Sequence, residues 1–424
     1  MSNKLSKQAS EASVRWIDKI CRPLLFSRLA KIEVGQVKII DSLGEKHFGS
    51  ADCCDDLTVE IKVIDQRFYS DIAFGGTVAA GEAYMQGYWL CNNLTGLVRI
   101  MLRNRQVMDQ VEGGFSLFKA PLLRLIHWLN RNSQAGSRRN IEAHYDLGND
   151  MFKLFLDPTM MYSCAYYADD TTSLDDAATA KLQRICDKLQ LSASDHVVEI
   201  GTGWGGFAIY AATHYGCKVT TTTISKQQFE IAQQRVQAAG LEDRVTLLME
   251  DYRDLKGTYD KLVSIEMIEA VGPQYLDTYF AKCSSLLKPD GLMLIQAITI
   301  QDQFYDQAIK SVDFIQRYIF PGGFIPSVTA ISNAVKNSTD TRLFQMEDIG
   351  PHYATTLRDW RQRFFENIDQ VKSLGYSEQF IAMWEFYLCY CEGGFLERTL
   401  GTSHLVFTKP QNKIDWRKSY RNIA

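Results

Sequence analysis

The chain has 424 residues, of which 46% are hydrophobic and 23% are charged, a composition typical of a soluble globular protein with a large core. The formal net charge is −4, and no basic run resembles those that follow a phosphate backbone, which excludes nucleic acid as the expected partner. No apolar segment reaches the about 18 residues needed to cross a bilayer, and the polar residues 1–10 lack the apolar stretch of a signal peptide.

The cysteines and the chain length narrow the class of protein further. Ten cysteines are scattered along the chain, without a CxxC pair and without a His/Cys cluster at the spacing of a zinc site. We therefore expect reduced thiols in a cytoplasmic protein, and no metal ion. A chain of 424 residues is long for one domain and suits two.

The N-terminal part of the chain predicts helices and strands in turn. Residues 11–31 carry apolar side chains at helical spacing with basic residues between them. Such a helix lies on a membrane surface or, more commonly, packs on its own domain. Residues 32–72 alternate apolar and polar in places and predict short strands, whereas residues 75–104 predict helices. Residues 105–140 form a basic connector, which fits either contact with anionic lipid headgroups or a solvated linker helix.

From residue 143 onward, strands and helices alternate, which predicts a parallel sheet covered by helices on both faces. Ligands of such sheets bind at the carboxyl ends of the strands. A helical insertion, residues 302–336, follows the fifth strand. The expected strands are residues 196–200, 218–223, 245–249, 261–266, 292–300, 343–349 and 403–408, and the expected helices include residues 226–239, 273–287, 357–374 and 377–399.

A glycine-rich turn follows the first of these strands. Four glycines within residues 201–206 separate the strand from a helical segment, so backbone N–H groups and a helix N-terminus can approach a ligand. The spacing suits both a dinucleotide and S-adenosylmethionine. Glu199 lies two residues before the first glycine, and residues 220–223, where a nicotinamide site places an acid, are all threonine. These two features favour S-adenosylmethionine.

Several segments resemble the cyclopropane-fatty-acyl-phospholipid synthases. They are residues 143–150 (AHYDLGND), 161–166 (MYSCAY), 250–255 (EDYRDL) and 318–321 (YIFP). The resemblance implies an α/β fold, with a seven-stranded Rossmann-like class I methyltransferase domain and a smaller mixed α+β N-terminal domain. The implied domains are an N-terminal lipid-associated domain (1–130), a basic linker (131–142) and the catalytic domain with its insertion (143–412).

The resemblance also implies an unusual reaction on the acyl chain of a phospholipid. The π electrons of a cis double bond attack the methyl carbon of S-adenosylmethionine, a carbocation forms, and a base removes a proton so that a cyclopropane ring closes. An alkene is a weak nucleophile, so the site must align it closely and exclude water. Aromatic faces must shelter the cation, and the candidates are Phe314, Tyr318, Phe320 and above all Tyr353.

In this family the base is a bound bicarbonate ion. By position, its implied ligands are Cys164, Glu269, Gln296, Ile298 and Tyr353. Glu269 would accept the bicarbonate O–H, and Tyr353 would supply a hydroxyl. Glu269 also fits a helix-capping or surface acid, and Cys164 also fits a small core residue.

Two positions depart from the family pattern. Ala270 follows the glutamate where many members have histidine, and Gln296 replaces a histidine ligand of bicarbonate. Glutamine can hold the ion by hydrogen bonds but cannot change charge near neutral pH, so it cannot relay a proton. The change leaves open a fatty-acyl methyltransferase that methylates the chain without closing a ring. A further residue, Cys391, matches the active-site cysteine of the family, and we expect it to line the pocket because the reaction requires no thiolate.

The resemblance assigns the cofactor site to residues at strand ends. Thr223 and Gln228 would contact the ribose or the methionine part, and Asp251 with Tyr252 would lie by the adenine. The full set is Tyr162, Ser163, Glu199, Gly201, Gly203, Gly205, Thr223, Ile224, Gln228, Asp251 and Tyr252.

The expected partners are phospholipid acyl chains, reached by peripheral association with the inner membrane surface, and a second copy in a homodimer. Two other classes of function stay open. A non-catalytic lipid-binding scaffold would need neither Glu199 nor Glu269. A small-molecule or RNA methyltransferase would favour an NPPY-like motif, where residues 264–267 read SIEM.

Overall fold

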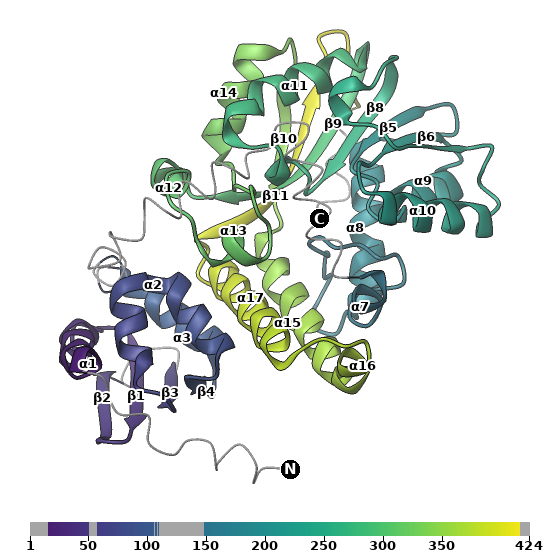
Figure 1. Cartoon of the computed structure of the whole chain (residues 1–424). Helices are drawn as coiled ribbons and strands as arrows, with labels where there is room; N and C mark the ends of the chain where they lie inside the picture. The colour runs from purple at the N-terminus through teal and green to yellow at the C-terminus, as the bar shows by residue number, and fades with distance from the viewer. Residues whose placement is uncertain (1–15, 51–56, 106, 108, 110–147, 416–424) are drawn as a thin grey trace. The chain divides into compact units, whose positions relative to one another are not determined.

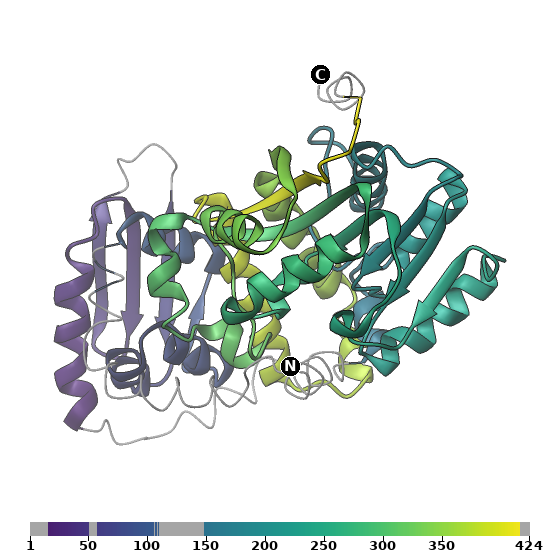
Figure 2. The ribbon, with the colours of Figure 1, turned by 90° about the horizontal axis from the view of Figure 1, so that it is seen from above.

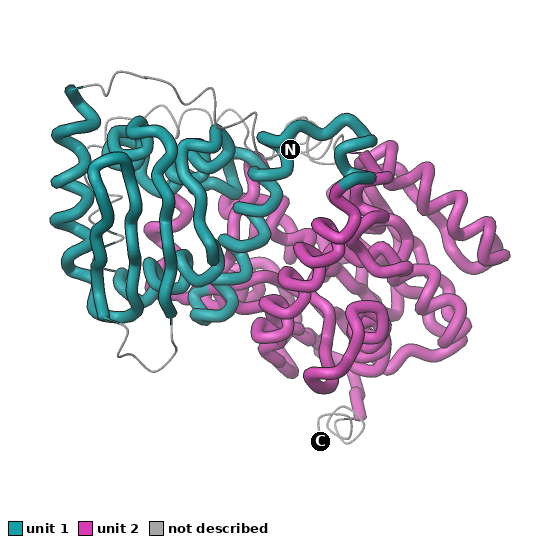
Figure 3. Tube along the Cα trace, turned by 90° about the horizontal axis from the view of Figure 1, so that it is seen from below, with its two compact units in different colours: residues 1–126, 311–319, 369–399 teal, residues 127–310, 320–368, 400–424 magenta. Residues whose placement is uncertain are grey.

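The computed structural model describes residues 16–50, 57–105, 107, 109 and 148–415 (Figure 1). The chain forms two compact units, coloured separately in Figure 3: residues 1–126, 311–319 and 369–399 form unit 1, and residues 127–310, 320–368 and 400–424 form unit 2. The linker expected at residues 131–142 and most of the basic connector lie outside the described residues, so the domain boundaries stay a prediction. No helix in the described part of the chain is long and apolar enough to span a membrane.

Unit 1 contains a four-stranded sheet with the order β2-β1-β3-β4. Strand β1 pairs antiparallel with β2 and parallel with β3. The strands expected within residues 32–72 are confirmed, except that α2 begins before residue 72. The elements are α1 (Trp16–Leu29), β1 (Gly35–Asp41), β2 (Gly44–Ser50), β3 (Thr58–Val63), α2 (Arg67–Met85), β4 (Trp89–Cys91), α3 (Leu94–Arg103), α13 (Phe314–Tyr318) and α17 (Glu378–Leu396).

Two segments far along the sequence, α13 and α17, pack into unit 1. The close approach depends on Gly81 of α2, where a Cβ atom would lie 2.4 Å from the Phe314 ring and 3.1 Å from the Phe386 ring. The Tyr84 hydroxyl donates to Glu385 at 2.8 Å. Unit 1 therefore includes two helices from residues 143–412, the range expected to form the catalytic domain.

Helix α1 runs alongside the strands of this sheet (Figure 2) and carries two apolar stripes. Cys21 and Leu25 are buried, which is the arrangement expected of a helix packed on its own domain. Trp16, Ile20 and Leu24, each one turn apart, are exposed by 72%, 51% and 38%. An exposed apolar stripe of this kind is also the arrangement expected of a helix that lies on a membrane surface.

Unit 2 contains a seven-stranded sheet with the order β10-β11-β9-β8-β5-β6-β7. The strands from β5 to β9 pair in parallel, and β11 is antiparallel to both β9 and β10. All seven strands were predicted, with β9 beginning earlier than expected. They are β5 (His196–Ile200), β6 (Lys218–Thr222), β7 (Val245–Leu248), β8 (Tyr259–Ile265), β9 (Leu287–Ile300), β10 (Arg342–Asp348) and β11 (Leu400–Thr408).

Both faces of this sheet are buried, each in its own core cluster. Successive side chains of a strand point to opposite faces, so neighbouring residues belong to different clusters. Val198 and Ile295 belong to one core cluster, with α11 and α14, whereas Val197 and Leu294 belong to the other, with α8, α9 and α10. The helices are α7 (Asn149–Lys153), α8 (Leu174–Lys188), α9 (Gly206–Tyr215), α10 (Lys226–Ala238), α11 (Leu276–Ser285), α12 (Asp302–Ala308), α14 (Val328–Ser338), α15 (Gly350–Glu366) and α16 (Ile368–Ser373), the last of which begins in unit 2 and continues into unit 1.

Candidate active site

The carboxyl ends of the parallel strands bring the predicted site residues of unit 2 to one edge of the sheet. Strand β5 lies between β6 and β8, so the turn after β5 sits where the chain order of the strands reverses. Open α/β sheets bind their ligands at this switch point. The loops after β5, β6, β7 and β8 therefore form the candidate site.

The glycine turn after β5 requires glycine at three positions. Gly201, Gly203 and Gly205 have φ values of 101°, 52° and 85°, in the region that other residues rarely adopt. The backbone N–H groups of Gly201 and Thr202 donate to Thr222 O at 3.1 and 3.0 Å, which fastens the turn to β6. Helix α9 follows directly, so the strand–turn–helix arrangement predicted for the cofactor is present.

Gly206 lies in this turn for a different reason. A Cβ atom there would lie 2.6 Å from Thr159 O and 2.7 Å from Met161 Sδ. Alanine would ordinarily stabilise a helix by about 1 kcal/mol relative to glycine. We expect Gly206→Ala to lower the free energy of unfolding by about 1–3 kcal/mol instead, because the backbone of Thr159 cannot move cheaply.

Urea unfolding of Gly206→Ala measures this effect directly. The matched control is Thr213→Ala on an exposed position of the same helix, which should change stability by less than about 0.5 kcal/mol. A Gly206→Ala variant more stable than the native chain would show that the close approach to residues 159–161 is relieved at no cost.

Glu199 lies within β5, and its side chain is buried. Its Oε2 accepts from the Thr221 hydroxyl at 2.6 Å, and Thr221 in turn contacts the Thr202 hydroxyl at 2.7 Å. Burial raises the pKa of Glu199 to about 8. Glu199 is thus a held, largely protonated acid beside the glycine turn, where the sequence placed a cofactor contact.

Thr223, Ile224 and Gln228 form the loop after β6 and the start of α10. The Thr223 hydroxyl donates to Gln228 Oε1 at 2.9 Å, and both side chains are buried. Ile224 lies between them in sequence and is partly buried. The structure therefore brings together the two polar residues expected to contact the ribose or the methionine part.

Asp251 and Tyr252 follow β7. The carboxylate of Asp251 accepts two hydrogen bonds from the Arg253 guanidinium, at 2.8 and 2.7 Å. The hydroxyl of Tyr252 is buried, and no described group forms a hydrogen bond with it. A buried hydroxyl without a partner fits a site that a polar ligand completes.

Tyr162 and Ser163 lie in the segment before α8. The Tyr162 ring contacts the rings of Trp360 and Phe320, with centroids 5.1 and 6.3 Å apart. The Ser163 hydroxyl accepts from Lys181 Nζ at 2.8 Å. These contacts place an aromatic cluster and a buried cation beside each other.

Three of the predicted bicarbonate ligands converge on a carboxylate of the chain itself, Glu266. The backbone N–H of Cys164 and the Gln296 amide donate to Glu266 Oε1 at 2.9 and 2.8 Å. The Tyr353 hydroxyl donates to Glu266 Oε2 at 2.7 Å. Glu266 follows β8 directly, and the next residue, Met267, packs against Gly201 of the glycine turn.

The other two predicted ligands, Glu269 and Ile298, contact each other. The Ile298 backbone N–H donates to Glu269 Oε1 at 2.6 Å. The second oxygen, Oε2, is buried, and no described group forms a hydrogen bond with it. Burial and the nearby charge of Glu266 raise the pKa of Glu269 to about 8. Glu269 thus keeps its proton near neutral pH and offers one unpaired oxygen atom.

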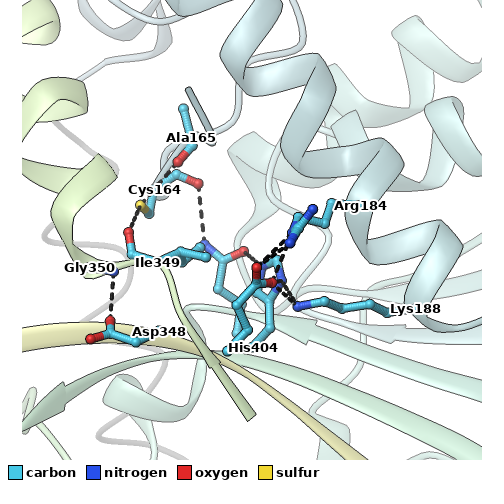
Figure 4. A network of polar contacts seen from close by, with 10 residues as sticks. Cys164, Ala165, Arg184, Lys188, Asp348, Ile349, Gly350 and His404 are labelled. Carbon is cyan, nitrogen blue, oxygen red and sulfur yellow. Dashed lines mark hydrogen bonds and ion pairs between the residues drawn. The ribbon is translucent and has the colours of Figure 1, made fainter. Parts of the chain in front are cut away.

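A buried chain of hydrogen bonds, in which Lys188 and His404 are labelled in Figure 4, orients Gln296. Lys188 Nζ, which is paired with Glu347, lies 2.9 Å from His404 Nδ1, and His404 Nε2 lies 2.9 Å from Gln296 Oε1. The Lys188 ammonium can only donate, so the Nε2 nitrogen of His404 carries the hydrogen and donates to Gln296. Burial holds the pKa of His404 well below its usual value, which keeps the ring neutral. The amide nitrogen of Gln296 is thereby turned toward Glu266.

Lys181 of α8 is a fully buried cation near this group. Burial lowers the pKa of Lys181 to about 8, although the charges of Glu266 and Glu199 act in the opposite direction. In return, Lys181 lowers the pKa of Glu266, which burial raises above its usual value. The candidate site therefore contains a buried counter-charge.

Cys391 lies on α17, in unit 1, whereas the other predicted catalytic residues belong to unit 2. Burial raises the pKa of its thiol far above the usual range, which favours the protonated thiol. The aromatic candidates are divided in the same way: Phe314 and Tyr318 belong to unit 1, and Phe320 and Tyr353 to unit 2. Pocket-lining by Cys391 stays a prediction.

The sequence did not single out Glu266, Lys181 or His404. Glu266 could have been found, because a carboxylate directly after a central parallel strand lies where ligands bind. His404 occupies the position opposite Gln296 on the neighbouring strand, and this register depends on tertiary pairing. The catalytic and cofactor roles of the predicted residues stay predictions.

Comparison with known proteins identifies the family. The model of the family described as mycolic acid cyclopropane synthetase matches residues 132–405. A tuberculostearic acid methyltransferase of Mycobacterium tuberculosis is 39% identical and covers 76% of this chain and 76% of its own. A cyclopropane-fatty-acyl-phospholipid synthase of Escherichia coli is 38% identical and covers 82% of this chain and 88% of its own.

Solved structures agree with these relatives. A cyclopropane synthase of Mycobacterium tuberculosis has a TM-score of 0.60 at 28% identity, covering 64% of this chain and 98% of its own. A mycolic acid cyclopropane synthase complexed with SAH and CTAB has a TM-score of 0.59 at 30% identity, with the same coverage. The predicted class I methyltransferase fold is thus confirmed. The chain belongs to the mycolic acid cyclopropane synthetase family and is an S-adenosylmethionine-dependent methyltransferase.

Proposed function

We propose that the protein methylates the cis double bond of an unsaturated phospholipid acyl chain and closes a cyclopropane ring. The observation that carries this proposal is the Glu266 carboxylate, held by three donors at the carboxyl end of β8, beside the glycine turn. Ring closure requires a base that removes a proton from a newly added methyl group. A fixed carboxylate in surroundings poor in water meets that requirement.

The residues at the strand ends fit S-adenosylmethionine. The glycine turn adopts backbone conformations that other residues rarely adopt, so its backbone can lie close to a ligand. The buried Tyr252 hydroxyl forms no hydrogen bond with any described group, so a polar ligand could pair with it. When bound, S-adenosylmethionine supplies an electrophilic methyl group. Glu199 and Gln228 would hold its polar parts. The ring faces of Tyr162 and Trp360 would exclude water and stabilise positive charge, with a contribution of about 2 kcal/mol for a desolvated contact.

The bicarbonate ion implied by the family resemblance does not fit the donors present. The N–H of Cys164, the amide of Gln296 and the hydroxyl of Tyr353 donate to Glu266, and the N–H of Ile298 donates to Glu269. An added anion would also meet the charge of Glu266 at close range. We therefore assign no step of the reaction to bicarbonate.

A second candidate function is methylation of a fatty-acyl chain without ring closure. One relative, 39% identical, is named a tuberculostearic acid methyltransferase, and another, 38% identical, a cyclopropane synthase. Both reactions begin with the same methyl transfer, and they differ in which proton the base removes. A non-catalytic scaffold is less favoured, since holding two carboxyl groups with raised pKa values costs stability and serves no purpose in lipid binding.

We also propose where the enzyme meets its lipid substrate and in which oligomeric state. The exposed apolar stripe of α1, Trp16, Ile20 and Leu24, supports contact with a membrane surface. We propose peripheral association with the inner surface of the membrane, from the cytoplasm. The homodimer rests on the family resemblance alone.

The purified protein, S-adenosylmethionine and vesicles of dioleoyl phosphatidylglycerol test this function. We expect lipid mass spectrometry to show the added mass of one CH2 group per modified chain, with loss of the olefin signal. Added mass with the olefin retained would assign the protein to the second candidate function. Unchanged lipid, with cofactor binding intact, would contradict both. Vesicles of a saturated phospholipid are the control and should remain unmodified.

A further inference from the structure

We propose that Glu266 is the catalytic base of this enzyme, and that its carboxylate takes the position that the family resemblance assigns to bicarbonate. This inference rests on the proposed function, because it names the group that receives the proton. It reassigns Cys164, Gln296 and Tyr353 from ligands of a bound ion to donors that fix a side chain of the protein.

The geometry of the donors carries the inference. Bicarbonate and a carboxylate share a single negative charge and a planar pair of oxygen atoms. Glu266 receives donors on both oxygens, from Cys164 N, Gln296 Nε2 and Tyr353 Oη, at 2.7–2.9 Å. These are three of the five groups expected around the ion. A single carboxylate therefore already satisfies the donor set, and the site holds its base permanently.

The backbone of Glu266 supports a functional role. Its φ is 48°, in the left-handed region, which costs a non-glycine residue about 1–2 kcal/mol. Its N–H donates to Gln296 O at 2.8 Å, and the three side-chain bonds hold the carboxyl group. Strain of this kind persists where the surroundings fix it, and it concentrates at catalytic positions.

The proposal also explains the departure at position 296. A glutamine cannot relay a proton, but it need not do so when the base is Glu266. Its task is to present an N–H to the carboxylate, and His404 secures that orientation by donating to Gln296 Oε1 at 2.9 Å. Gln296 and His404 are therefore positioning residues.

The reaction balances with Glu266 as the acceptor. The alkene π electrons form a bond to the methyl carbon, the carbon–sulfur bond breaks, and S-adenosylhomocysteine leaves. A C–H bond of the new methyl group then breaks. Its proton passes to a Glu266 oxygen, and its electron pair closes the ring on the cationic carbon. Glu266 releases the proton to solvent before the next turnover, so the products are the cyclopropane, S-adenosylhomocysteine and one proton.

Two substitutions at this position, Glu266→Gln and Glu266→Gly, test the proposal. The amide keeps the volume of the side chain but removes the base, whereas glycine relieves the left-handed backbone and empties the space between the three donors. We expect each variant to lose product formation on dioleoyl phosphatidylglycerol vesicles by about 100-fold or more. Added bicarbonate should restore activity to Glu266→Gly but not to Glu266→Gln. The native enzyme should work equally well in buffer depleted of carbon dioxide.

A binding measurement separates this proposal from the proposed function. We expect isotope-labelled bicarbonate, followed by NMR, to bind Glu266→Gly and not the native protein, whether or not any lipid is methylated. Calorimetric titration with S-adenosylmethionine shows that each variant is folded. Native activity that depends on bicarbonate, or a Glu266→Gln variant as active as the native enzyme, would overturn the assignment. A native protein that methylates no lipid, while only Glu266→Gly binds bicarbonate, would overturn the proposed function alone.

Discussion

Glu269→Gln should abolish lipid methylation while leaving the affinity for S-adenosylmethionine nearly unchanged. The Oε2 atom of Glu269 is buried without a hydrogen-bond partner among the described groups, which suits contact with a bound species. An amide keeps the acceptor for Ile298 but cannot release or take up a proton as the carboxyl group can, so the variant has no ionisable group at this position. We expect the rate of lipid methylation to fall by about 100-fold or more. Lost cofactor binding would show that Glu269 belongs to the cofactor site instead.

The Glu269→Gln variant also tests whether the pKa of Glu269 is raised in the folded protein. Glu269 keeps its proton up to about pH 8 in the folded protein but ionises near its usual value of 4.5 when unfolded. Between these values only the folded state binds the proton, so the native chain loses stability relative to Glu269→Gln as the pH rises. The slope approaches about 1.4 kcal/mol per pH unit in urea unfolding. A stability difference independent of pH would contradict the environment described for Glu269.

Lys181→Met should shift the pH dependence of the reaction upward. Lys181 is fully buried and lowers the pKa of Glu266, so its removal leaves the carboxylate without its counter-charge. The base then takes up a proton at a higher pH and is inactive when protonated. We expect the acidic limb of the rate profile to move up by about 1–2 pH units, with a rate at pH 7 reduced about 10-fold or more and recovered at higher pH.

Lys218→Met, at an exposed position on β6, is the matched control and should leave the profile in place. Thermal unfolding of Lys181→Met is measured in parallel, because Lys181 is fully buried and donates to the Ser163 hydroxyl, so its removal can also cost stability. A rate that falls equally at every pH would assign Lys181 a structural role and leave Glu266 without the proposed electrostatic support.

The sequence predicted the sheet of unit 2 well because most of its strands are runs of apolar or β-branched residues that alternate with helical segments. The run from His196 to Ile200, followed by the glycine turn, has the same bounds in the structure. The packing of distant segments against one another could not be predicted from the sequence. Nothing in the local pattern of residues 369–399 indicates that α17 packs against α2 and α3, since this depends on where glycines such as Gly81 allow close approach.

The candidate site, too, could be predicted only in part. The predicted residues of unit 2 gather at the carboxyl ends of the strands, whereas Cys391 belongs to unit 1. The group they surround, however, could not be read from the pattern, because the resemblance placed an ion where this chain places Glu266. The substitution at position 296 was visible in the sequence. Its partner, His404, was not, since strand register brings together residues 108 positions apart.

A crystal structure of the protein with S-adenosylhomocysteine, grown in the presence of bicarbonate, tests the central claim most directly. The account predicts the Glu266 carboxylate within hydrogen-bond distance of Cys164 N, Gln296 Nε2 and Tyr353 Oη, with no separate anion among them. Density for a bicarbonate ion on these three donors, with the Glu266 side chain turned away, would contradict it.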